Sequence, residues 1–216
     1  MNDFAAVIFD MDGVIVDSEP LHARAFEQVF GEMGCGETHG MDFEAYYGRS
    51  DRALWDDFIA RHHPPQSFEE LAAWKRDRFL KLLTKEQPIF APVPDLLAKL
   101  SRRYLLALAS GSIHTVIDEV LAMRNLGRFF PVVVSVEDVG RGKPAPDVFL
   151  RTANLLGVPP RKCWVVEDAP AGIEAARAAG MSVIAITNTL PAAKLSGATH
   201  VVGDYAELER LLLPEE

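Results

Sequence analysis

The sequence predicts an α/β protein with a doubly wound parallel sheet and a helical domain inserted into it. Short apolar runs alternate with helical stretches along most of the chain. These runs are apolar at successive positions rather than at every second one, which is typical of parallel strands covered by helices on both faces. One long interval has no strand, and a single right-handed crossover does not need that length.

The expected elements follow one another in a regular order. We expect strands at Phe4–Phe9, Tyr104–Ala109, Val132–Val136, Cys163–Val166, Ser182–Thr187 and Thr199–Val202. We expect helices at Pro94–Arg102, Ile113–Arg124, Asp147–Leu156, Ala171–Ala179 and Tyr205–Leu213. Because a helix follows most of the strands, the segments form βα units.

The interval between the first two strands predicts the inserted domain. Its apolar pattern indicates helices at Leu21–Met33, Asp51–Ala60 and Phe68–Lys85. Pro88, Pro92 and Pro94 mark the linker that returns to the sheet. We therefore expect a helical domain at 18–90 and a catalytic core made of 1–17 and 91–216.

Composition excludes several classes of function. The 216 residues carry 22 Lys and Arg against 31 Asp and Glu, a formal net charge of −9, and 49% of them are hydrophobic. This acidic balance, without a basic tract, argues against nucleic acid or an anionic membrane as the main partner. No apolar run approaches the roughly 18 residues of a membrane span. Two cysteines without metal-ligand spacing favour a reducing compartment, so we expect a cytoplasmic protein. We also expect a monomer.

Polar residues follow three of the expected strands. Asp10 and Asp12 follow the first strand, Ser110 follows the second, and Glu167-Asp168 follow the strand that starts at Cys163. The carboxyl ends of parallel strands share one edge, and ligands bind there where the strand order reverses. The sequence thus predicts that four carboxylates and a hydroxyl converge on one crevice.

This combination indicates phosphoryl chemistry. Crowded carboxylates repel one another unless a cation lies among them, and oxygen ligands of this kind suit Mg²⁺ beside a phosphate. Lys143, on the loop after the Val132–Val136 strand, could reach the same edge. Carboxylates, a metal, a lysine and a hydroxyl together can stabilise a transferring phosphoryl group.

Each motif taken alone has a structural alternative. The Asp10–Gly13 segment could be a turn with side-chain hydrogen bonds or a fragment of a calcium loop. The segment Ser110–Ser112 could cap the next helix, and Glu167-Asp168 could do the same for the helix after Pro170. Gly140–Lys143 is not a phosphate-binding Walker loop, because Pro144 stands where that motif needs Ser or Thr. The coincidence of three strand ends favours the functional interpretation.

In their order along the chain, these segments resemble the four motifs of the haloacid dehalogenase superfamily. The residues that carry the resemblance are Asp10–Ser18, Ser110, Lys143-Pro144 and Glu167-Asp168. The helical insertion after the first motif resembles the α-helical cap of subclass I, on a Rossmann-like core. Within subclass I, the segments Asp17–His22 and Lys143–Asp147 are similar to those of the β-phosphoglucomutase-like phosphatases.

The resemblance implies a Mg²⁺-dependent phosphatase acting on a small phosphorylated metabolite such as a sugar phosphate. It implies Asp10 as the nucleophile that becomes an aspartyl-phosphate, and Asp12 as the general acid and base. Asp10, the Asp12 backbone carbonyl and Asp168 would hold the metal, with Glu167 close by. Ser110 and Lys143 would stabilise phosphoryl charge, and Gly111 and Ser112 beside them would bind the substrate. An Asp at position 12 disfavours dehalogenation.

Substrate specificity is expected from the cap. The resemblance assigns His22, Arg49, Arg52 and Lys75 to substrate binding, although the last three could equally form a solvated basic face. The mutase holds a second phosphate with an Arg where this chain has Asp51, so β-phosphoglucomutase-type isomerisation is the second candidate. A signalling receiver domain with a phospho-accepting Asp is a remote third, and the lifetime of the phosphoaspartate would distinguish it. Trp55, Phe58, Trp74 and Phe79 are expected in the cap core.

Overall fold

The computed structural model describes residues 4–46 and 51–214, without the side chain of residue 44, and divides into two compact units. The first unit comprises Met1–Asp17 and Ile89–Glu216, and the second comprises Ser18–Pro88. The second unit ends two residues earlier than the expected boundary at 90. Ile89 forms an antiparallel bridge with Val16, and the Phe90 amide donates to the Ile15 carbonyl at 3.2 Å, so both residues join the core unit.

The core unit contains a six-stranded parallel sheet in the order β3-β2-β1-β4-β5-β6. The strands are β1 (Ala6–Phe9), β2 (Leu105–Ala109), β3 (Val132–Val134), β4 (Cys163–Glu167), β5 (Ser182–Ile186) and β6 (His200–Val202). All four residues of β1 are buried, as expected for a central strand between two helical layers. The chain moves from β1 towards β3 and then returns to β4, so the strand order reverses between β1 and β4.

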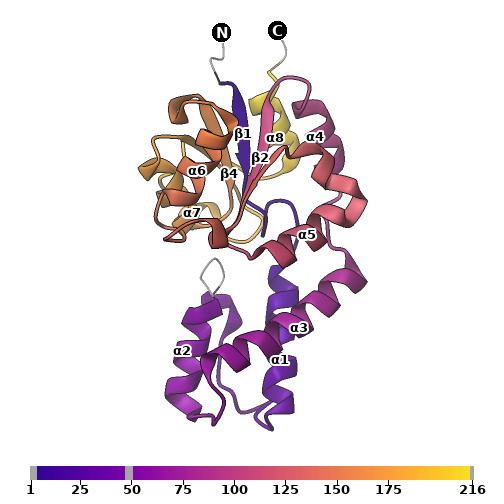
Figure 1. Cartoon of the computed structure of the whole chain (residues 1–216), viewed down its shortest axis with the longest axis vertical. Helices are drawn as coiled ribbons and strands as arrows, with labels where there is room; N and C mark the ends of the chain where they lie inside the picture. Colours follow the sequence, from indigo (N-terminus) through magenta and orange to yellow (C-terminus); the bar gives the residue numbers. More distant parts are fainter. Residues whose placement is uncertain (1–3, 47–50, 215–216) are drawn as a thin grey trace. The chain divides into compact units, whose positions relative to one another are not determined.

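Helices cover both faces of this sheet. Figure 1 shows α6 and α7 on one side of the sheet and α4 and α8 on the other. The helices of the core unit are α4 (Val93–Leu100), α5 (His114–Ala122), α6 (Asp147–Leu156), α7 (Pro170–Ala178) and α8 (Tyr205–Leu212). Short 3₁₀ turns lie at η2 (Met123–Phe129), η3 (Val136–Asp138), η4 (Pro160–Lys162) and η5 (Ala192–Lys194). This arrangement confirms the predicted fold class.

Two expected bounds were wrong for local reasons. The strand expected at Val132–Val136 ends at Val134, because Ser135 caps η3 and its hydroxyl accepts from the Glu137 amide at 3.1 Å. The helix expected to reach Arg124 ends at Ala122, because Arg124 and Asn125 adopt left-handed backbone angles, with φ of 50° and 54°.

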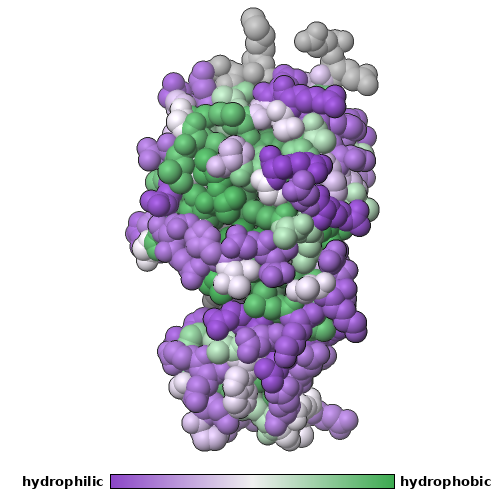
Figure 2. Space-filling view, turned by 45° about the vertical axis from the view of Figure 1, so that its right-hand side comes forward, coloured by the Kyte–Doolittle hydropathy of each residue, from purple (hydrophilic) through white to green (hydrophobic). Residues whose placement is uncertain are grey.

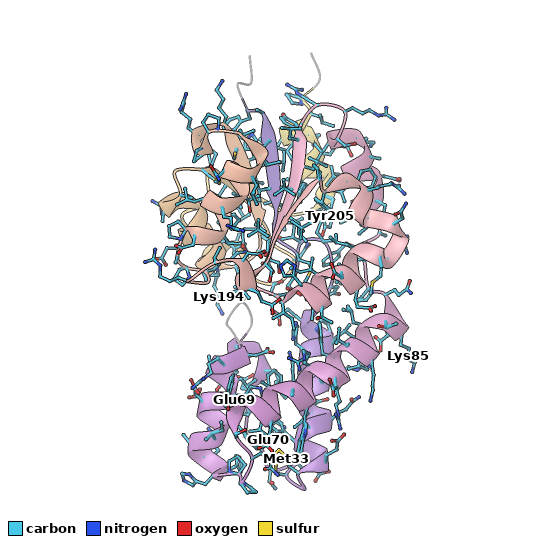
Figure 3. The ribbon with its side chains drawn as sticks, in the orientation of Figure 1. Met33, Glu69, Glu70, Lys85, Lys194 and Tyr205 are labelled. Atoms are coloured by element: carbon cyan, nitrogen blue, oxygen red, sulfur yellow. The ribbon has the colours of Figure 1, made fainter. Side chains whose placement is uncertain are left out.

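The second unit is helical in its described part and has its own core. It contains α1 (Glu19–Glu32), η1 (Phe43–Tyr46), α2 (Asp51–His62) and α3 (Phe68–Glu86). A capping box begins α3: the Ser67 hydroxyl accepts from the Glu70 amide at 3.2 Å, and the Glu70 carboxylate (Figure 3) accepts from the Ser67 amide at 2.8 Å. Trp55, Phe58 and Phe79 are buried and Trp74 packs against this core, which confirms the expected cap core.

The hydrophobic residues of the surface and of the helices relate to the expected absence of a membrane partner and to the expected monomer. Among the described residues, no helix is both long and apolar enough to cross a membrane. Hydrophilic side chains cover most of the visible face of the second unit, whereas a hydrophobic area is visible on the core unit (Figure 2). The exposed large hydrophobic side chains of the described chain are Leu105, Leu150, Leu155 and Val201. The monomeric state stays a prediction.

Candidate active site

Three carboxylates meet where the strand order reverses. Asp10 directly follows β1, Glu167 ends β4, and Asp168 comes next. The Asp10 amide donates to the Val166 carbonyl at 3.0 Å, so the ladder continues to the point where the carboxylates project. Asp10, Glu167 and Asp168 are 7%, 1% and 4% exposed, and each offers an oxygen within 4.8 Å of those of the others.

Lys143 joins this cluster from the segment between η3 and α6. Its ammonium donates to Asp10 Oδ1 and to Glu167 Oε1, both at 2.6 Å, and lies 4.9 Å from the centre of the Phe149 ring. The other oxygen of Glu167 accepts from the amides of Asp168 and Ala169, at 3.0 and 3.1 Å. Glu167 therefore holds Lys143 with one oxygen and the turn into α7 with the other.

The charges of this cluster are not balanced by the chain itself. Burial raises the pKa of Asp10 to about 7. Lys143 opposes this shift only in part, and the negative charges of Glu167 and Asp12 add to it. Burial also raises the pKa of Asp168, and the neighbouring carboxylates Glu167 and Asp10 reinforce the shift. Burial alone would lower the pKa of Lys143, but Asp10 and Glu167 outweigh it and raise it.

These properties fit a magnesium ion. Three buried carboxylates face one ammonium, so the ionised cluster lacks positive charge, and a divalent cation would supply it. Its donor atoms are all oxygens, which are the ligands that Mg²⁺ prefers. Among the described residues, the carboxylates that come this close are those of Asp10, Glu167 and Asp168, so a role of Asp12 as a ligand would have to come from its backbone carbonyl.

Asp12 instead contacts the loop after β2. The Ser112 hydroxyl donates to Asp12 Oδ2 at 2.9 Å, and the fully buried Ser110 hydroxyl accepts from the Ser112 amide at 3.0 Å. Ile113 is the N-cap residue of α5 and makes no side-chain cap hydrogen bond, while the His114 amide donates to Glu137 Oε2 at 2.7 Å. The helix-cap alternative for Ser110–Ser112 is therefore not realised, and both hydroxyls stay at the sheet edge.

Two glycines make this close packing possible. Gly13 has a φ of 71°, and a Cβ on it would overlap the Asp168 carboxylate and the Thr189 hydroxyl. A Cβ on Gly172, in α7, would overlap the Glu167 carboxylate. The first glycine belongs to the predicted Asp10–Gly13 motif. Sequence reasoning did not find the second, because nothing local shows that a carboxylate from the preceding strand packs against that turn of α7.

Sequence reasoning also missed residues that follow β3 and β5. The Ser135 hydroxyl donates to the Ser112 carbonyl at 2.8 Å, and the Thr189 hydroxyl donates to Asp168 Oδ2. Thr189 comes just after the expected strand Ser182–Thr187, so the rule that located Asp10 and Ser110 could have located it too. Ser135 lies inside the expected strand Val132–Val136, and only the observed end of β3 at Val134 places it after a strand. Ser and Thr are common in turns, however, and their type alone indicates no function.

In the helical unit, Lys75 is buried rather than solvated. Its ammonium donates to Asp51 Oδ2 at 2.6 Å and hydrogen-bonds His22 Nδ1, and the residue is 2% exposed. It also lies 4.9 Å from the ring centres of Phe26 and Phe79. The His22 ring stacks on Phe79 with centroids 4.0 Å apart. The solvated-face interpretation is wrong for Lys75.

The other two cap residues differ from Lys75. Arg52 is exposed, donates to Asp56 Oδ1 at 2.7 Å one helical turn away, and lies 4.2 Å from the Phe68 ring centre. This environment favours a solvated face for Arg52. Arg49 lies outside the described residues.

A doubly wound sheet with a buried cluster of carboxylates and a lysine at its point of reversal is typical of α/β enzymes. A family model described as haloacid dehalogenase-like hydrolase matches residues 4–180. The chain therefore belongs to the haloacid dehalogenase-like hydrolase family. This confirms the predicted family and favours an enzyme over a receiver domain.

The relatives include named phosphatases. The chain is 35% identical over 185 residues to a fructose-1-phosphate phosphatase of Escherichia coli, covering 84% of this chain and 95% of the relative. It is 31% identical over 181 residues to a phosphorylated carbohydrates phosphatase of Thermotoga maritima, covering 83% of each. The crystal structure of a β-phosphoglucomutase from Clostridium difficile superposes with a TM-score of 0.78 at 25% identity, covering 95% of this chain and 96% of that one. The predicted enzyme class, phosphoric monoester hydrolase, is confirmed.

Proposed function

We propose that the protein is a Mg²⁺-dependent phosphatase that hydrolyses a small phosphorylated metabolite, in particular a sugar phosphate, through an aspartyl-phosphate on Asp10. The observation that carries this proposal is the contact of Lys143 with both Asp10 and Glu167, beside Asp168, at the switch point of the sheet. Asp10, Asp168 and the Asp12 carbonyl would hold the ion. When bound, Mg²⁺ offsets the negative charge of the phosphate monoester and of the attacking carboxylate.

In the proposed covalent step, Asp10 is the nucleophile. Its carboxylate oxygen attacks phosphorus, the bond between phosphorus and the ester oxygen breaks, and an acyl phosphate forms on Asp10. Asp12 donates a proton to the departing alkoxide. It then takes a proton from the water that attacks the phosphorus of the acyl phosphate, which releases inorganic phosphate and restores Asp10. The Ser112 hydroxyl fixes the orientation of the Asp12 carboxylate for both transfers.

The remaining groups bind and stabilise the phosphoryl group. Lys143 neutralises charge on Asp10 and on the transferring oxygens, and Glu167 keeps its ammonium in place. The Ser110 hydroxyl and the Gly111 amide provide hydrogen-bond donors for phosphoryl oxygens at the end of β2, while the Ser112 amide donates to Ser110. This role does not require the Ser110 hydroxyl to give up its contact with the Ser112 amide, because a hydroxyl donates and accepts at once.

The class of substrate rests on the relatives, two of which are named for fructose 1-phosphate and for phosphorylated carbohydrates. We propose that His22, Arg49 and Lys75 of the helical unit contribute to recognition of the sugar, as the family resemblance implies. Arg52, which the resemblance also assigns to this role, is exposed and paired with Asp56, so we leave it out of the proposal. The hydrogen-bonded pair of Lys75 and His22 offers polar groups suited to hydroxyls.

Steady-state release of phosphate from a panel of sugar and polyol monophosphates with Mg²⁺ tests this function. The wild-type protein should release phosphate, and Asp10→Asn should abolish release while the fold is kept. Asp118→Asn is the matched control, because it makes the same change on an exposed face of α5. Full activity of the Asp10→Asn variant would contradict covalent catalysis at this residue.

Phosphomutase activity is the second candidate, and the structural similarity to a β-phosphoglucomutase favours it. A mutase must retain a bisphosphate, which requires a cation for the second phosphate. In this chain Asp51 occupies the corresponding position and holds Lys75 in an ion pair. We therefore expect no appreciable conversion of β-glucose 1-phosphate to glucose 6-phosphate, even when the reaction is primed with the bisphosphate.

A further inference from the structure

The loop after β5 contacts Asp168, one of the proposed metal ligands. It is the third strand end at this site, after those of β1 and β4. Thr189 lies in this loop, and its hydroxyl donates a hydrogen bond to Asp168 Oδ2. Gly13, whose missing Cβ leaves space for both the Asp168 carboxylate and the Thr189 hydroxyl, lies on the other side of the contact. The ends of β1, β4 and β5 therefore meet at the carboxylate of Asp168.

The neighbouring residue anchors this loop. Asn188 donates through Nδ2 to the Gly13 carbonyl at 2.8 Å and to the Tyr205 hydroxyl at 2.9 Å. Tyr205, at the start of α8 (Figure 3), donates in turn to the Val14 carbonyl at 2.8 Å. Thr189 is thus attached to the same turn that carries Asp10 and Asp12, and its hydroxyl is held in place.

The bond from Thr189 has a specific effect on Asp168. A carboxylate rotates about the bond to its Cβ, and the charges of Asp10 and Glu167 push Asp168 away from the cluster when all three are ionised. A neutral hydroxyl that donates to one oxygen restricts this rotation and stabilises the ionised carboxylate. Hydrogen bonds of this kind orient the ligands of a metal and raise its affinity.

We infer that Thr189 is a positioning residue that orients Asp168 and thereby sets the affinity of the site for Mg²⁺. This inference rests on the proposed Mg²⁺ site. A purely structural role predicts something different, namely a loss of stability in the metal-free protein without a change in the affinity for the ion. The two roles can be separated because the hydroxyl of Thr189 can be removed without a change in side-chain volume.

The experiment is calorimetric titration of Mg²⁺ into the metal-free, full-length protein, with thermal unfolding in chelator beside it. Thr189→Val removes the hydroxyl and keeps the shape, Thr189→Ala removes it without the branched side chain, and Thr189→Ser keeps the hydroxyl. Thr115→Val is the matched control, since Thr115 is exposed on α5. Asp168→Asn serves as the reference for loss of the ligand itself.

We expect Thr189→Val and Thr189→Ala to weaken Mg²⁺ binding by about 10- to 100-fold. Thr189→Ser and Thr115→Val should bind the ion as the wild type does, and the midpoint of unfolding in chelator should change little in all four variants. Wild-type affinity in Thr189→Val or Thr189→Ala, with binding lost in Asp168→Asn, would overturn this inference and leave the metal site in place. Unchanged binding in Asp168→Asn, or no binding by the wild type, would overturn the proposed metal site and the inference together.

Discussion

Lys75 and Asp51 form an ion pair inside the helical unit, with Nζ 2.6 Å from Oδ2. The side chain of Lys75 is 3% exposed and that of Asp51 is 46% exposed, so the carboxylate lies between the buried ammonium and solvent. Asp51 stands at the position where the mutase carries an Arg, and its carboxylate cancels the charge of Lys75.

Replacing Asp51 should therefore change how the protein treats doubly phosphorylated ligands. Asp51→Arg should strengthen binding of a sugar bisphosphate, measured as a lower inhibition constant against hydrolysis of the monophosphate. Asp51→Asn should lower the free energy of unfolding by about 1 kcal/mol. The loss is this small because the Asp51 carboxylate is half exposed, so solvent screens its attraction to Lys75. Efficient primed isomerisation by the wild-type protein, with little free phosphate, would contradict the phosphatase assignment.

Asp12→Ala should show the role of Asp12 as acid and base through the leaving group. We expect kcat to fall by about 10²- to 10⁴-fold on alkyl phosphates. The fall should be smaller on aryl phosphates, because their leaving groups need little protonation. Ser112→Ala should show the same preference more weakly, since it only frees the Asp12 carboxylate. An equal loss on both substrate types would instead indicate a role in metal binding.

Gly13→Ala should damage the site beyond its effect on the backbone. Gly13 and Gly180 have similar positive φ values, 71° and 75°, but a Cβ on Gly180 would meet no atom within 4 Å. Both variants should lose about 1 kcal/mol in the free energy of unfolding from backbone strain. Only Gly13→Ala should also lose Mg²⁺ affinity, because its Cβ displaces the Asp168 carboxylate. Chemical denaturation and calorimetry compare the two, and equal Mg²⁺ affinity in both would contradict this assignment of Gly13.

The contribution of Asp10 to the stability of the metal-free protein should fall as the pH rises from about 4 to about 7. Over this range the folded protein keeps a proton on Asp10, whose pKa is raised to about 7, while the unfolded chain has already released it. The unfolded chain therefore binds fewer protons, and the free energy of unfolding decreases with pH. Urea denaturation in chelator should show this decrease, and Asp10→Asn should reduce it.

Mg²⁺ should reverse the loss at neutral pH. An ion present at one hundred times its dissociation constant adds about 2.7 kcal/mol to the free energy of unfolding. The midpoint of thermal unfolding at pH 7 should rise with Mg²⁺ and return with chelator. A midpoint that does not respond to Mg²⁺ would show that the carboxylate cluster does not bind the ion.

The sequence predicts the core of the site well because strand ends obey a simple geometric rule. Asp10, Ser110 and Glu167 follow apolar runs, and parallel strands bring such positions to one edge whatever lies between them in the chain. The same rule applies to Ser135 and Thr189 once the observed strands are known. The bonds that place them at the site, however, go to the Ser112 carbonyl and the Asp168 carboxylate, more than twenty residues away in the chain, and no local pattern reports these.

Lys75 shows a second limit of sequence reasoning. It lies four residues from both Leu71 and Phe79, which are buried on the same face of α3, so helical spacing already placed it on the apolar side. A lysine is rarely buried unless it has a partner. Its partner Asp51 is on another helix, and only the tertiary structure shows that the two meet.

The account depends most directly on a phosphate bound covalently to Asp10. The measurement is acid quenching during turnover of a sugar phosphate, borohydride reduction, and mass spectrometry of the peptides. With an aryl phosphate, whose leaving group needs little protonation, Asp12→Ala slows hydrolysis of the intermediate more than its formation and should increase its amount. The account predicts that residue 10 alone is converted to homoserine, and that Asp10→Asn gives none. Rapid phosphate release by the wild type, with Asp10 unmodified both in the wild type and in Asp12→Ala, would contradict this account.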